Sequence, residues 1–306
     1  MAQKDVKSRI ASVKNIQKIT RAMEMVAAAR LRRAEQRIEA LRPYASAIRR
    51  MTRQAAEAAQ NVPNLPILEE HESVSTVGML LVTGDRGLAG AFNSQIVRAG
   101  TRAANDLDGK DTRWYASGRR GVSSLRFRGR EVVGEYTGFT DRPAYANARE
   151  IASDMMAAYI DGEVDQVDIF YNRYISPLSQ EVTRETLLPL QHATIFEESD
   201  EESLGGRASG SDEEHKHEGP SALVEYEPGP EEILQRLVPA YVEISIYRAL
   251  LESTASEHGA RMTAMRNASE NASDLIKDLT LQMNRERQAE ITQEIMEVVA
   301  GAESLT

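Results

Sequence analysis

Apolar residues recur every three to four positions over two long stretches, one near each end of the chain. In the second stretch, from Glu231 to Ala300, Leu237 can be taken as position a of a heptad, and most of the following a and d positions are apolar. Such a seam allows an α-helix to pack along another helix in a left-handed coiled coil. At 1.5 Å per residue this stretch would span roughly 105 Å, which is wider than a globular core. We therefore expect a protruding helix whose seam is covered by another helix.

The first stretch, from Val6 to about Met51, predicts that second helix. Its apolar positions are Ile10, Val13, Ile16, Ile19, Met23, Ala27, Leu31, Ala34, Ile38, Leu41, Ala45 and Ile48. The irregular steps before Leu31 should change the supercoil locally. Pro43 and Pro239 each remove a main-chain hydrogen bond inside a helical pattern, so a bend is expected at both. The simplest arrangement is an antiparallel pair made by residues 1–60 and 230–304.

Between the two helices the apolar period changes. Strands are predicted at 77–82, 113–116, 166–171 and 181–189, helices at 93–106 and 143–160, and a basic segment without assigned structure at 119–130. Strands that alternate with helices favour a small α/β domain with a largely parallel sheet, here over about residues 74–195. Residues 197–222 carry almost no apolar side chains and are predicted to form an acidic flexible loop. The predicted fold is thus an α/β insert between two long helices of a coiled coil.

Charge is unevenly distributed along the chain. The net charge is −10, yet residues 1–60 hold fourteen Lys and Arg against five Asp and Glu, whereas residues 197–232 hold two against thirteen. The two regions should attract different partners. The chain has no cysteine, which excludes disulfides and thiol chemistry. The N-terminus lacks the apolar core of a signal peptide and no apolar run approaches eighteen residues, so we expect an intracellular protein.

Candidate chemistry is sparse. TGDRGLAG, residues 83–90, follows a strand and precedes a helix, as a dinucleotide-binding turn would, but its glycines are spaced G-x-x-G-x-x-G rather than G-x-G-x-x-G. A turn that permits tight strand-to-helix packing is favoured, and an enzyme that uses a dinucleotide is the alternative. His215 and His217 in the acidic loop could bind a metal weakly, although a solvated loop explains them better. His258 fits a polar residue in the helix seam better than an acid or base. No catalytic residue, cofactor or metal site is predicted.

Two surface features call for partners. The basic N-terminal helix could bind nucleic acid, but it lacks neighbouring aromatic residues and belongs to an acidic chain, so an acidic protein partner is favoured. The C-terminal end, residues 291–302, is more apolar than a free helix tip. Since the C-terminal helix is about 20 residues longer than its partner, this tip should sit in an external sleeve.

Five segments carry a specific resemblance to a known family. They are ITRAMEMVAAARLRRAE (19–35), GDRGLAGAFN (84–93), ESTASEHGARMTAM (252–265), RQAEIT (287–292) and ITQEIMEVVAGAES (291–304). Together they resemble the γ subunits of F-type ATP synthases over nearly the whole chain. The resemblance implies an antiparallel coiled coil of the terminal helices with a Rossmann-like α/β domain. It also implies a non-catalytic rotor shaft that couples rotation of a membrane c-ring to ATP synthesis or hydrolysis in a hexamer of α and β subunits.

The resemblance also implies contacts, residue by residue. The catch with the catalytic subunits corresponds to Arg287, Gln288 and Thr292. The positions facing the acidic lever segments of those subunits correspond to Arg9, Lys18, Arg21, Met23, Arg30 and Arg33. The c-ring and ε subunit would be contacted by Tyr226 and Glu227, and the apolar bearing tip would comprise Ile291, Ile295, Val298 and Val299. The implied location is peripheral, on the cytoplasmic face of a bacterial plasma membrane, with membrane contact only through the c-ring.

Overall fold

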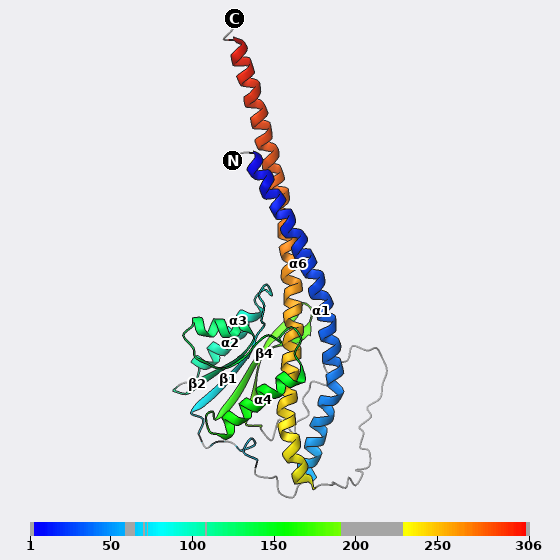
Figure 1. Ribbon diagram of the computed structural model, residues 1–306, viewed down its shortest axis with the longest axis vertical. Coiled ribbons are helices and arrows are strands. Elements are labelled where there is room, and N and C mark those ends of the chain that lie inside the picture. The colour runs from blue at the N-terminus through cyan, green and yellow to red at the C-terminus, as the bar shows by residue number, and fades with distance from the viewer. Residues whose placement is uncertain are drawn as a thin grey trace.

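Two very long helices form the backbone of the molecule. The computed structural model describes residues 3–58, 65–69, 71, 73–107, 109–190 and 229–303. Helix α1 (Gln3–Ala58) has 56 residues and helix α6 (Pro230–Glu303) has 74, and they run side by side (Figure 1). The start of α1 packs on Leu279 and its middle on Ala255, so the pair is antiparallel, as predicted. The end of α6 extends beyond the start of α1 (Figure 1).

Neither internal proline ends its helix. Helix α1 continues through Pro43 and α6 through Pro239. A bend at either position stays a prediction.

The seam between α1 and α6 changes character along its length. Near the start of α1 it is apolar, with Val6, Ile10, Val13, Ile276, Leu279 and Met283 in one cluster. Lower down, a second cluster includes Leu31, Ala34, Ile38, Ala255 and Met262. Between these levels, Thr20 Oγ1 lies 2.7 Å from Ser269 Oγ, and Gln17 Nε2 donates to Ser269 O at 3.5 Å. The middle of the coiled coil therefore has a polar layer.

Two of the apolar positions of the first stretch, Ile16 and Ile19, lie outside the seam. Their side chains are 53% and 59% exposed. At 3.6 residues per turn, each step of three rotates about 60° away from the starting face, so Val13, Ile16 and Ile19 cannot all face α6. The seam instead continues from Val13 through Gln17 and Thr20.

The α/β part contains a five-stranded sheet in the order β3-β2-β1-β4-β5. The strands are β1 (Thr76–Val82), β2 (Asp111–Ser117), β3 (Val132–Tyr136), β4 (Gln166–Ser176) and β5 (Ser179–Leu188). Pairs β1–β2, β1–β4 and β2–β3 are parallel, while β4–β5 is antiparallel. The largely parallel sheet is confirmed.

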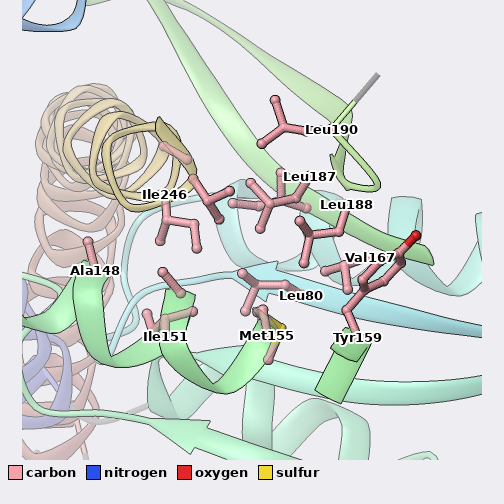
Figure 2. Close-up of a cluster of buried hydrophobic side chains, with 14 of the residues drawn as sticks. Leu80, Ala148, Ile151, Met155, Tyr159, Val167, Leu187, Leu188, Leu190 and Ile246 are labelled. Atoms are coloured by element: carbon pink, nitrogen blue, oxygen red, sulfur yellow. The ribbon is translucent and has the colours of Figure 1, made fainter. Parts of the chain in front are cut away.

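Helices cover both faces of this sheet. Helices α2 (Phe92–Asn105) and α3 (Arg119–Phe127) pack on one face, and α4 (Tyr145–Ile160) packs on the other. Alternation along β1 sends Met79 and Leu81 to the first face and Leu80 and Val82 to the second. Figure 2 shows that Ile246 of α6 lies among Leu80, Leu187 and residues of α4. The long helix is thus itself part of the α/β core.

The segment 119–130, to which no element was assigned, contains α3, and β3 follows it. Helix α3 reads RRGVSSLRF, in which Gly and Ser have low helix propensity, and only Gly121, Val122 and Leu125 are buried. Strand β3 is a short edge strand with Gly134 in its middle and an exposed Val133. Both elements depend on packing against β2 more than on local sequence, which is why the pattern missed them.

Candidate functional site

The end of α6 is exposed along its whole circumference. From Arg287 to Ala300 every residue is exposed, and the packed cluster with α1 ends near Met283. The residues of the predicted bearing tip share this exposure: Ile291, Ile295, Val298 and Val299. An exposed apolar rod of this kind is a typical binding surface.

The three predicted catch residues lie at the base of this rod. Arg287 and Gln288 are adjacent and exposed, and Thr292 follows one turn later. Thr292 Oγ1 donates to the carbonyl oxygen of Gln288 at 2.8 Å, so the hydroxyl is bonded within its own helix. Both the guanidinium of Arg287 and the side-chain amide of Gln288 are exposed on the surface of α6.

The predicted lever contacts follow α1. Arg9, Lys18, Arg21 and Arg33 are exposed and Met23 is partly buried. Arg30 is partly buried, and its Nη1 donates to Asp141 Oδ1 at 2.6 Å, within the same chain. The exposed Ile16, Ile19 and Val26 accompany these residues on the helix surface. This apolar component was not predicted, because the spacing of apolar residues does not separate the face toward α6 from the face toward solvent.

The predicted c-ring and ε contacts, Tyr226 and Glu227, lie outside the described residues. The acidic segment 197–222, which includes His215 and His217, also lies outside them.

The glycine turn 83–90 lies against α6. In an open α/β sheet, ligands bind at the carboxyl ends of the parallel strands, where the strand order reverses. Here that point lies between β1 and β4, and α6 fills it: Ser253 Oγ donates to Val82 O at 3.2 Å. A Cβ on Gly84 would lie 2.7 Å from the carboxyl group of Glu257. The cavity left between these elements is about 10 Å³, which is at the lower limit for a single water molecule and far too small for a nucleotide.

This geometry favours packing over dinucleotide binding for the glycine turn. The carboxylate of Glu257 lies where an anionic phosphate would have to approach, and the peptide N–H of Gly84 is already satisfied by Asn93 Oδ1 at 2.8 Å. Gly84 is needed because α6 comes so close to the turn, Gly87 because Arg120 of α3 does, and Gly90 because its φ is +55°.

Small polar residues of α6 bind the α/β part through its main chain. Thr254 Oγ1 donates to Thr140 O at 2.9 Å, and Ser256 Oγ donates to Asn172 O at 3.0 Å. Together with Ser253 these bonds tie α6 to three different segments of the α/β part. The motif ESTASEHGARMTAM is therefore the joint between the long helix and the sheet.

Three ionisable residues of α6 complete the joint. Glu257, His258 and Arg261 are all buried. Arg261 Nη2 donates to Glu257 Oε1 and, at 3.2 Å, to Gly87 O. Burial raises the pKa of Glu257 despite the opposing effect of Arg261. Burial, and then the charge of Arg261, lower the pKa of His258 from 6.5 to about 4, so its imidazole is neutral at neutral pH.

The tautomer of His258 follows from its neighbours. Arg261 Nη1 lies 3.3 Å from His258 Nδ1, and because a guanidinium can only donate, Nδ1 is the acceptor. The imidazole proton is therefore on Nε2, which lies 3.6 Å from Asp141 Oδ1. His258 was interpreted as a polar residue of the helix seam, but it faces the α/β part; a role in register stays untested.

Within the residues that the structure describes, there is no group of three or more His, Asp or Glu side chains placed to hold a metal ion. None of the described helices is long and apolar enough to span a bilayer.

Comparison with known proteins agrees with this architecture. A family model described as ATP synthase matches residues 2–305. The ATP synthase gamma chain of Rubrobacter xylanophilus is 41% identical over 302 residues, covering 99% of this chain and 98% of that protein. The corresponding protein of Frankia casuarinae is 41% identical over 99% of this chain and 97% of its own length.

Solved structures show the same fold. A chain from the central stalk and c-ring of the Tetrahymena thermophila mitochondrial ATP synthase aligns with a TM-score of 0.59 and 26% identity, covering 82% of this chain and 99% of that one. A chain from the Euglena gracilis mitochondrial ATP synthase aligns with a TM-score of 0.66 at 16% identity, covering 99% and 94%, which supports the fold alone. The full-length family match and the identity to bacterial relatives lead to one conclusion: the chain belongs to the ATP synthase gamma chain family.

Proposed function

We propose that this chain is the central rotor shaft of an F-type ATP synthase. Residues 1–60 and 230–304 would form the shaft and residues 74–195 the foot. The observation that carries the proposal is that one helix, α6, is a core element of the α/β part at one end and an exposed apolar rod at the other. A rigid element that joins a membrane-facing foot to a catalytic head is what mechanical coupling requires.

The partners follow from the family and from the surfaces. The exposed end of α6 would lie inside a hexamer of α and β subunits, and the foot would rest on a c-ring together with an ε subunit, through Tyr226 and Glu227. Neither nucleic acid nor a direct membrane contact is part of this function. The chain would act as a peripheral protein at the cytoplasmic face of a bacterial plasma membrane.

The shaft would not catalyse any step itself. Turning of the c-ring by ion flow would turn the shaft, and its asymmetric faces would move the catalytic sites through their binding states. The exposed basic residues Arg9, Lys18, Arg21 and Arg33 suit a moving contact, because exposed ion pairs contribute only about 0.2–1 kcal/mol each and can break and re-form. Arg30, bonded to Asp141, is the member of the lever set that the foot already engages.

The catch residues give the sharpest test of this function. Arg287 can make a bidentate contact with a carboxylate, and Gln288 adds a neutral donor and acceptor. We expect the double variant Arg287→Ala, Gln288→Ala to lower coupled ATP synthesis in membrane vesicles much more than it lowers assembly of the complex.

The matched control is Arg285→Ala, an exposed arginine two residues away on another side of the same helix. Its synthesis rate should stay close to that of the wild type. Equal synthesis rates in the double variant and the control would count against the catch assignment. A wild-type chain that never copurifies with a nucleotide-binding hexamer would overturn the shaft function itself.

A further inference from the structure

One loop of the foot contacts both long helices. Residues 138–143 connect β3 to α4 and are called the clamp loop below. Toward α1, Asp141 accepts the hydrogen bond from Arg30, and the carbonyl oxygen of Pro143 accepts one from Arg37 Nη2. Toward α6, the carbonyl oxygen of Thr140 accepts from Thr254, and Asp141 faces Nε2 of His258.

The clamp loop is itself held by Asp85 of the glycine turn. Asp85 Oδ2 accepts hydrogen bonds from Gly138 N at 2.9 Å, Thr140 N at 3.2 Å and Thr140 Oγ1 at 3.0 Å. Its Oδ1 accepts from Arg119 N at 3.1 Å. Burial would raise the pKa of Asp85, but these hydrogen bonds together lower it, so the side chain is a carboxylate at neutral pH. An aspartate with this many donors fixes the loop rather than binding a ligand.

Between the polar layer and the clamp loop, Glu24 of α1 pairs with Arg266 of α6 at 2.9 Å, so the weakest part of the seam is the polar layer itself. There α1 and α6 meet through Gln17, Thr20 and Ser269 instead of interlocking aliphatic side chains. A polar layer resists sliding and twisting less than a packed apolar layer, since little apolar area is lost when it shifts. The clamp loop therefore supplies a further attachment of α1 to the foot, beside the bond from Tyr174 to Glu35, close to the point where α6 enters the foot.

We propose that the clamp loop, positioned by Asp85, is the contact through which the foot drives α1 and α6 together. Asp141 is its central positioning residue, because the same carboxyl group is bonded to α1 and faces α6. In the absence of this contact the foot would still turn α6, to which it is joined by its core. Helix α1 would then follow only through its seam, the bond from Tyr174 to Glu35 and the burial of Ala55 in the core. This inference rests on the proposed shaft function.

The test uses the complete complex in sealed vesicles. The ratio of ATP-driven ion pumping to ATP hydrolysis should fall severalfold in Asp141→Ala, whereas the hydrolysis rate and the subunit composition stay close to wild type. Asp141→Asn, which keeps an oxygen acceptor for Arg30, should recover part of the ratio. The matched control is Glu135→Ala, which removes the exposed ion pair with Arg126 on the same α/β part without touching either long helix.

A second measurement does not depend on activity. Because the chain has no cysteine, spin labels can be placed on Lys14→Cys in α1 and Arg102→Cys in α2, both exposed positions. The distance distribution between the labels should broaden in Asp141→Ala and not in Glu135→Ala. A pumping ratio and a distance distribution that both match wild type in Asp141→Ala would overturn the clamp, while a wild-type complex that couples normally would leave the shaft function standing.

Discussion

The two halves of α6 have a similar pattern of apolar residues but lie in opposite surroundings. In the lower half Ile246 is fully buried and Leu250 is 2% exposed, whereas near the tip Ile295 is 56% and Val298 72% exposed. Both halves carry aliphatic residues at helical spacing, yet one is inside a core and the other is bare. The apolar spacing thus predicts that one face of the helix will be buried. It does not predict whether the residues that bury it belong to the same chain or to another subunit.

The comparison separates the apolar residues that stabilise the fold from those that are available to bind other subunits. The lower half contributes to the free energy of folding through the core shared with β1, β5 and α4 (Figure 2). The exposed end of the upper half, from Arg287 on, contributes little to the folding of the free chain because no described residue packs on it. Its apolar surface is available for binding energy with other subunits.

The largest contrast is expected from matched truncations on this one helix. Ile246→Ala should lower the free energy of unfolding by about 2–5 kcal/mol, because it removes buried methylene groups and leaves a cavity. Ile295→Ala should change it by less than about 0.5 kcal/mol, since that side chain is exposed. Urea unfolding of the full chain, followed by circular dichroism, measures both. Equal losses would show that the tip is packed in the free chain.

A smaller effect on the free energy of unfolding is expected when the pH is changed, because of His258 in the joint. His258 binds a proton at pH 6.5 when unfolded and only near pH 4 when folded. Between these values the unfolded chain holds more protons, so stability falls as the pH is lowered from about 6.5 to about 4, by about 3 kcal/mol in total. Above pH 6.5 this contribution is constant.

The variant His258→Gln isolates that contribution, because all other groups titrate in both proteins. The difference in unfolding free energy between wild type and variant should shift in favour of the variant as the pH falls from 7.5 to 4.5. If the difference does not change over this range, His258 is solvated. The joint around His258 is then less tightly packed than the core around Ile246.

The smallest effect is expected from the polar layer between the two halves. The Thr20–Ser269 hydrogen bond should contribute about 0.5–1.5 kcal/mol, the usual net value for such a bond. A double-mutant cycle with Thr20→Val and Ser269→Ala, measured by urea unfolding, gives the coupling between the two hydroxyls. A coupling near zero would indicate that the layer contributes no pairing and that α1 is held at this level by its neighbours.

The sequence predicted much of this fold because its signals were local and periodic. The two long helices, the strands at β1, β2 and β4, and the antiparallel pairing follow from spacing and from the need to cover two apolar seams. It failed at Ile16 and Ile19, where two faces of one helix are both apolar and spacing cannot choose between them. It also missed α3 and β3, whose weak propensities are overridden by packing on β2.

The candidate site divides in the same way. Exposed residues such as Arg287 and Gln288 could be singled out from sequence because a family motif carries them. The roles of Asp85 and Asp141 could not be found, since the partners in these bonds lie 34 to 111 positions away in the chain, and the loop that joins them has no pattern of its own. The clue available was the motif GDRGLAG, whose aspartate proves to hold the clamp loop.

By itself the sequence determined that this protein has two long amphipathic helices, an α/β insert and an apolar tip, because helical and strand periods are set by local backbone geometry. Only the tertiary structure decided which of the apolar faces are buried by other parts of the same chain. It placed the lower half of α6 in the core of the sheet, Glu257 at the carboxyl ends of the strands, and Asp141 between the two long helices. Those outcomes depend on the summed burial and hydrogen bonding of segments far apart in the chain, which no local pattern records.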